Sequence, residues 1–91
     1  MVEKYGINKP IIQIRLMRAR WGSCIKLKNI LLLNFELIKA PKFCLDYVVL
    51  HELIHFIHRS HDAEFYAFLT VLMPDWRIRK EILDEEVARE L

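Results

Sequence analysis

The chain contains few of the residues that break or crosslink a fold. Its 91 residues include 2 glycines, 3 prolines and 2 cysteines. There is no Gly/Ser-rich linker, internal repeat or low-complexity run, so we expect one domain over residues 1–91. Cys24 and Cys44 are not closely spaced, which favours two packed thiols over a disulfide or a metal-binding pair.

Long hydrophobic runs are also absent. No apolar stretch approaches the roughly 20 residues that span a bilayer. The N-terminal segment MVEKYGINKP is charged and lacks the apolar centre of a secretory signal. The sequence therefore predicts no contact with a membrane, and we expect a cytoplasmic protein. Hydrophobic residues make up 54% of the chain, enough for one small core that would gain stability from a bound metal.

The charges are unevenly distributed, although the net charge is only +2. Residues 1–43 carry nine Lys or Arg and two Asp or Glu, whereas residues 44–91 carry five and ten. The basic half raises nucleic-acid binding as a weaker interpretation, because no known DNA-binding motif accompanies it. Attraction between basic strands and acidic helices within the molecule explains the same asymmetry.

The most informative motif is HELIH, which contains His51, Glu52 and His55. His-Glu-x-x-His on a helix is a signature of zinc hydrolases. The two histidines are about one turn, or roughly 6 Å, apart along the axis, so both imidazoles can bind one ion. Glu52 points in another direction and can reach a water molecule held by that ion. We therefore predict His51 and His55 as ligands of Zn²⁺ and Glu52 as the general base.

A catalytic zinc site needs a third protein ligand. His58 lies too far along the same helical face to converge with the first pair. His61 is better placed, because Arg59 and Ser60 interrupt the apolar pattern and allow the chain to turn back. We predict His61 as the third ligand. Glu64 on the following helix is the alternative, and Asp62 is a weaker one.

The surroundings of the motif argue against a chance match. Apolar residues flank it from Tyr47 to Ile57, and unpaired polar groups would be costly in a largely buried helix. All four histidines of the chain also fall between His51 and His61. Both facts favour a metal site.

Four segments together resemble the YgjP-like metallopeptidase domain. They are RWGSC (20–24), NILLLNFELIKAP (29–41), LDYVVLHELIH (45–55) and HRSHDAEFY (58–66). The resemblance implies a zinc-dependent peptidase in which the residue matching His61 is the third ligand. The chain departs from the usual pattern at Ser60, Asp62 and Tyr66. The His61–Asp62 step also resembles the related WLM and SprT-type proteases, which are associated with the clearing of DNA–protein crosslinks.

The patterns predict a small α+β domain. Ile11–Met17 and Ile30–Leu37 should form an antiparallel hairpin, with Trp21–Asn29 as a turn and Trp21 as an aromatic plug. This sheet should pack on a zinc-binding helix that starts at Pro41 and runs to about His58. Two more helices should follow, one capped by Asp62 and running to about Leu72, the other from Asp75 towards Leu91.

These features leave alternatives for function. The first is a metallopeptidase that acts on peptide or protein substrates, which an exposed strand edge could bind by main-chain pairing. Lysines such as Lys26 and Lys28 could instead simply protect that edge. The second is a zinc-stabilised binding or adaptor module with little or no activity, associated with nucleic acid or DNA–protein crosslinks. A latent enzyme, with its cleft covered by the C-terminal helix, is a third.

Overall fold

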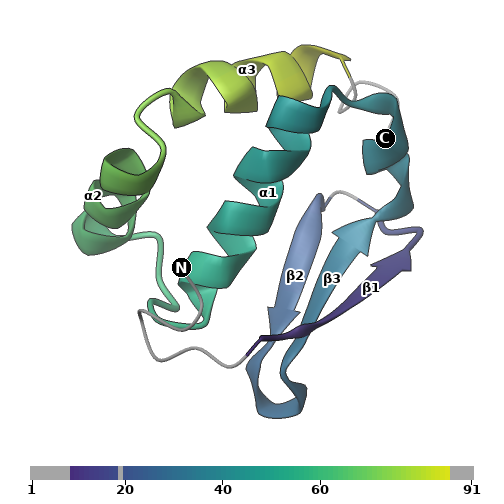
Figure 1. Ribbon diagram of the computed structural model, residues 1–91, viewed down its shortest axis with the longest axis horizontal. Helices are drawn as coiled ribbons and strands as arrows, with labels where there is room; N and C mark the ends of the chain where they lie inside the picture. The colour runs from purple at the N-terminus through teal and green to yellow at the C-terminus, as the bar shows by residue number, and fades with distance from the viewer. Residues whose placement is uncertain (1–8, 19, 87–91) are drawn as a thin grey trace.

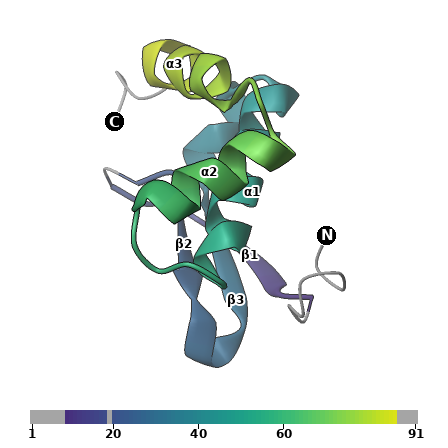
Figure 2. The same cartoon turned by 90° about the vertical axis from the view of Figure 1, so that its left-hand side faces the viewer.

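Helix α1 (Lys42–His55) forms the middle layer of the molecule. The computed structural model describes residues 9–18 and 20–86, and in Figure 1 the sheet lies on one side of α1 while α2 (Ala63–Leu72) and α3 (Trp76–Glu86) lie on the other. Figure 2, turned by 90°, shows α2 in front of α1. Because α1 is covered on both sides, its buried residues extend over more than half of its circumference: Cys44, Tyr47, Val48, Leu50, Glu52 and Ile54.

The sheet has three strands, β1 (Ile11–Arg15), β2 (Gly22–Ile25) and β3 (Ile30–Asn34), in the order β1-β3-β2. β3 pairs in parallel with β1 and antiparallel with β2. The predicted hairpin between the first and third of these segments is therefore wrong. The hairpin joins β2 to β3, and the sheet is mixed rather than antiparallel.

The turn predicted for Trp21–Asn29 is also wrong over Gly22–Ile25, because these residues form β2. Only Lys26–Lys28 forms a short 3₁₀ turn, which Asn29 closes in the left-handed conformation with φ of 53°. Glycine, serine and cysteine give β2 little intrinsic strand propensity. The strand forms because β3 offers it a complete register, from Gly22 opposite Leu33 to Ile25 opposite Ile30.

The helices were predicted more accurately. Asp62 caps α2, accepting a hydrogen bond from the Phe65 backbone N–H at 3.0 Å, as the sequence indicated. α1 ends at His55, three residues earlier than expected, and Pro41 stands just before its first turn. α3 begins at Trp76, and the predicted extension from 87 to 91 lies outside the described residues. Within the described residues, no helix has both the length and the apolar character needed to cross a membrane.

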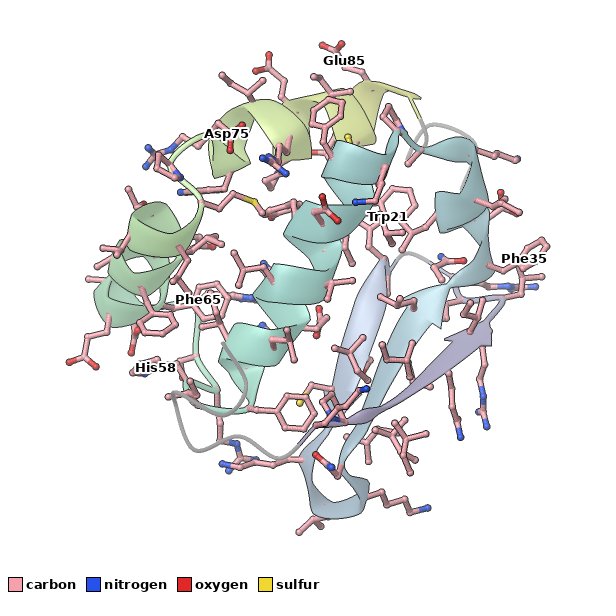
Figure 3. The ribbon with its side chains drawn as sticks, viewed as in Figure 1. Trp21, Phe35, His58, Phe65, Asp75 and Glu85 are labelled. Atoms are coloured by element: carbon pink, nitrogen blue, oxygen red, sulfur yellow. The ribbon has the colours of Figure 1, made fainter. Side chains whose placement is uncertain are left out.

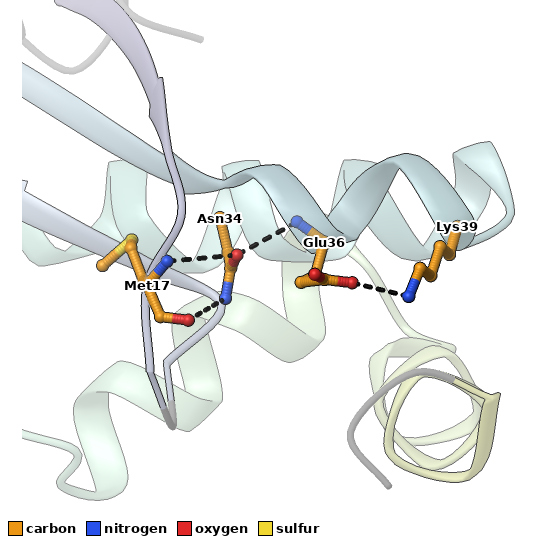
Figure 4. Close-up of polar contacts among 4 residues, drawn as sticks. All are labelled: Met17, Asn34, Glu36 and Lys39. Carbon is orange, nitrogen blue, oxygen red and sulfur yellow. Dashed lines mark hydrogen bonds and ion pairs between the residues drawn. The ribbon is translucent and has the colours of Figure 1, made fainter. Parts of the chain in front are cut away.

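Asn34, at the end of β3, joins the strands to the segment before α1. Only 1% of the residue is exposed. Its Oδ1 accepts from the Glu36 N–H at 3.0 Å and caps the 3₁₀ helix η2 (Phe35–Lys39) (Figure 4). Its Nδ2 donates to the carbonyls of Met17 at 3.1 Å and Arg20 at 2.6 Å. One amide thus fixes the chain where it leaves β1, where it approaches β2 and where it leaves β3.

Replacing Asn34 by alanine should destabilise the protein by about 3 kcal/mol, because it removes a cap and leaves two backbone carbonyls unpaired. Urea unfolding followed by circular dichroism measures this loss. Asn34→Asp keeps the acceptor but not the donor group, and should be at least as destabilising near neutral pH. A loss below about 1 kcal/mol in Asn34→Ala would show that water replaces these bonds.

Candidate metal centre

Three histidine side chains converge at the carboxyl end of α1. His51 and His55 come from α1, and His61 comes from the connection between α1 and α2. The Nε2 atoms are 3.3 Å apart for His51 and His55, 3.1 Å for His51 and His61, and 2.9 Å for His55 and His61. The three nitrogens expected from the sequence therefore lie at the corners of one small triangle.

The size of this triangle fits a metal ion. Nitrogens about 2.0–2.1 Å from a tetrahedral Zn²⁺ are separated by roughly 3.3 Å, close to the three observed distances. Neutral imidazoles have one N–H each, so three Nε2 atoms facing one another cannot all be satisfied by mutual hydrogen bonds. A cation at their centre would satisfy all three lone pairs. The donor set therefore fits the ion that the sequence indicates.

The backbone after α1 orients one of the rings. His55 Nδ1 lies 3.1 Å from the carbonyl oxygen of His58, so this nitrogen carries the proton and Nε2 presents its lone pair. The His58 carbonyl can reach this ring because α1 ends at His55 and the chain turns there. A hydrogen bond from the His58 N–H to the carbonyl of Ile54, at 2.8 Å, holds the turn in place. The same turn brings His61 back to the end of α1. His51 differs, because its buried Nδ1 has no hydrogen-bond partner among the described residues.

Phe65 packs against all three rings, a role that sequence reasoning missed. Its side chain is fully buried, and its ring centroid lies 4.9, 4.7 and 5.0 Å from those of His51, His55 and His61. Figure 3 shows it between α2 and α1. The available signal was its position in the first turn of α2, three residues after the Asp62 cap. Phe65 holds the imidazoles in place and excludes water from behind them.

The other candidate ligands lie elsewhere. The Asp62 carboxylate caps α2 through Phe65. Glu64 is 3.8 Å from His58 Nδ1, and its side chain is 79% exposed. His58 packs near Phe68 of α2, with ring centroids 6.1 Å apart, and Figure 3 shows it below α2. The structure groups none of these three with the histidine triad in the part of the chain that it describes.

Glu52 lies on the face of α1 that packs against the sheet. It is only 8% exposed, and β2 approaches it closely at Gly22. A Cβ atom at Gly22 would lie 3.0 Å from Glu52 Cγ and 2.9 Å from the Leu32 carbonyl oxygen. The glycine is therefore required for close approach within a strand, rather than for the tight turn predicted at this position. Trp21, the predicted plug, is half-buried against the core.

The triad and Glu52 share one cleft of about 820 Å³. One wall is β2 with the residues just before and after it, and the other is α1. Lys80 is the contribution of α3 within the described residues. The complete lining is Arg20, Trp21, Gly22, Ser23, Cys24, Ile25, Lys26, Leu27, Tyr47, Val48, His51, Glu52, His55, Arg59, His61 and Lys80.

Burial shifts the ionisation of this cleft towards neutral groups. Burial, together with smaller effects of His55, His61 and Lys80, lowers the pKa of His51 to about 4. Burial also lowers the pKa of His55, so both rings are neutral and able to bind a metal at pH 7. It raises the pKa of Glu52 to about 7, although the nearby Arg20 opposes this shift. Desolvation likewise raises the pKa of Tyr47 to about 12.

Comparison with known proteins identifies the family. The chain matches the YgjP-like metallopeptidase domain over residues 1–86. Among solved structures, it is similar to the crystal structure of the metallopeptidase zymogen of Pyrococcus abyssi abylysin, with a TM-score of 0.72 and 21% identity. The likeness covers 92% of this chain and 82% of abylysin, and at this identity it shows the fold alone. No curated protein matches the chain.

The family match includes both walls of the cleft, the helix with its three-histidine cluster and the strand that packs against Glu52. A peptidase of this class requires a divalent metal, and the histidine cluster has the geometry to bind one. The chain belongs to the YgjP-like metallopeptidase family and is a metal-dependent peptidase.

Proposed function

We propose that the protein is a zinc-dependent peptidase in which His51, His55 and His61 hold the ion and Glu52 is the general base. The observation that supports this most directly is the convergence of three imidazole nitrogens in the cleft that also contains Glu52. Zinc bound there would act as a Lewis acid on the scissile carbonyl and on the attacking water. The resemblance to the YgjP-like domain supports the same ligand set.

Glu52 is suited to move the proton. Its carboxylate lies in the wall of the cleft, one residue from His51, and its pKa of about 7 is close to the pH at which it must accept and release a proton. A bound cation would lower that pKa and favour the carboxylate form that a base needs. Glu52 would take a proton from the attacking water and give it to the leaving amine.

The substrate main chain would bind along β2. This strand is at one edge of the sheet, paired on one side with β3, and its residues line the cleft. The unpaired edge of a strand presents N–H and C=O groups that match those of an extended peptide. Pairing there would place a peptide between the edge and the histidine cluster. The sequence suggested that an exposed strand edge could bind the substrate by main-chain pairing. We assign that role to β2, a strand that was not predicted from the sequence.

Removal of His61 should abolish stable zinc binding. Loss of an outer-shell partner alone weakens metal binding about 10–100-fold, so loss of a ligand should weaken it by more than about 100-fold. Native mass spectrometry should show one zinc per wild-type chain and none on His61→Ala. His58→Ala and Glu64→Ala are matched controls outside the triad and should keep their zinc. Zinc retained by His61→Ala but lost by Glu64→Ala would move the third ligand to Glu64.

Replacement of Glu52 by glutamine should lower peptide cleavage by about 10²–10⁴-fold, because a neutral amide cannot accept the proton. Zinc content should remain at one ion per chain. The measurement is turnover of a quenched fluorescent peptide library, with metal content determined on the same samples. Zinc-loaded wild-type protein that turns over no more peptide than Glu52→Gln would instead favour the zinc-stabilised binding module.

The burial of Glu52 should also destabilise the metal-free protein as pH rises. Below about pH 4.5 the carboxyl is protonated in both the folded and unfolded states, and Glu52 has no effect. Between that pH and about 7 the unfolded chain loses the proton first, so the free energy of unfolding falls by up to about 3 kcal/mol. Glu52→Gln should avoid this loss. Urea unfolding with a chelator, at pH 4 and pH 8, should show its advantage only at the higher pH; an equal difference at both would refute the charge explanation.

A further inference from the structure

The cleft is rich in positive charge beyond what its proposed chemistry requires. Among the described residues, four basic side chains line it, Arg20, Lys26, Arg59 and Lys80, and Glu52 is the single acidic one. A metal ion bound by the three histidines would add its own positive charge to that of these basic residues. Charges of one sign around a concave surface concentrate their field in the cavity and attract ligands of the opposite sign.

Three of these four cations form no ion pair in the part of the chain that the structure describes, although Arg20 is near enough to Glu52 to lower its pKa. Among the described residues, no ion pair involves Arg20, Lys26 or Arg59, and all three are exposed. Lys80 is the exception, because its Nζ lies 2.9 Å from Asp84 on the next turn of α3. Elsewhere on the helices, basic side chains such as Lys42 and Arg79 are paired with an acidic neighbour. The cleft therefore contains three cations that form no ion pair within the described residues, whereas others of this kind, such as Arg15 and Arg77, lie outside it.

Two of these three cations, Arg20 and Lys26, lie at the two ends of β2. Arg20 is two residues before Gly22, the first residue of the strand, and Lys26 directly follows Ile25, the last. Arg20 and Lys26 are six positions apart, which corresponds to roughly 20 Å in an extended backbone. An extended peptide of about six residues has the same length. Side chains of a peptide lying along this edge would pass one cation at each end. Arg59, beyond the end of α1, lies on the opposite wall with the triad.

We propose that the cleft selects acidic peptide segments, with Asp or Glu on either side of the bond that is cleaved. This inference rests on the proposed peptidase function and adds the class of substrate. A nucleic acid carries negative charge as well, but its backbone has no alternating N–H and C=O groups to pair with the β2 edge. The cations that surround this edge therefore favour a polyanionic peptide.

The test compares two fluorescent peptides that differ only in charge, one with glutamates around its centre and one with glutamines. Each is titrated into zinc-loaded Glu52→Gln protein, which should not consume it, and binding is followed by fluorescence anisotropy. At low salt the acidic peptide should bind about tenfold more tightly. High salt should remove most of this difference, because it screens charges in an open cleft.

Two lysines of the same short turn provide a matched pair of variants. Lys26 and Lys28 are both exposed, but only Lys26 lines the cleft. In the Glu52→Gln background, Lys26→Gln should reduce the preference for the acidic peptide by about two- to fivefold, the effect of one exposed charge pair. Lys28→Gln should leave it unchanged.

The inference is overturned if the two peptides bind equally, if neither binds, or if Lys28→Gln reduces the preference as much as Lys26→Gln. Tighter binding of a single-stranded oligonucleotide with the same number of charges would also overturn it, in favour of nucleic acid. Cleavage of both peptides by the wild-type protein is measured separately. A charge preference in binding without any cleavage would reject the peptidase function, whereas cleavage without a preference would reject only the substrate class.

Discussion

The architecture depends on how closely β2 can approach α1. At Gly22 no side chain separates the strand from the helix, and even a Cβ atom would collide with the Leu32 carbonyl and approach Glu52 too closely. This contact buries the carboxylate and fixes the wall of the cleft in one step. It also fixes where β2 begins and ends, and so where Arg20 and Lys26 stand relative to the triad.

The opposite side of α1 is organised by an aromatic contact. Phe65 of α2 packs against His51, His55 and His61, while Tyr47 and Trp76 continue the aromatic layer towards α3 with ring centroids 6.4 Å apart. α1 therefore presents its histidines to one layer and its glutamate to the other. Such an arrangement needs a helix that is covered on both sides, which explains why polar groups occur in so apolar a segment.

The parts of the site that sequence could predict are those with local geometry. His51, Glu52 and His55 follow from helical spacing, and His61 followed from the expected break after Arg59. The cap at Asp62 is local in the same sense and was confirmed. Phe65, Gly22 and Lys80 matter through contacts with residues distant in the chain, and spacing carries no information about those.

The strand topology could not be predicted for a related reason. Apolar alternation identified the β1 segment and an apolar run identified the β3 segment, but neither pattern distinguishes a parallel from an antiparallel partner. The short β2, with Gly22, Ser23 and Cys24, resembles a turn in composition and is a strand only because β3 pairs with it. The error about the turn therefore led directly to the error about the hairpin.

The helix cap at Asp62 has a consequence for the electronic character of the centre. Its carboxylate is engaged with the start of α2, and Glu64 lies beside His58, so neither is grouped with the cluster. The donors that remain are three imidazoles, which bind a metal in their neutral form. A divalent ion bound by these three neutral ligands would form a centre with a net double charge, whereas a carboxylate in the third position would cancel part of that charge. By engaging the Asp62 carboxylate, the start of the second helix would thus help to set the Lewis acidity of a metal bound at the end of the first.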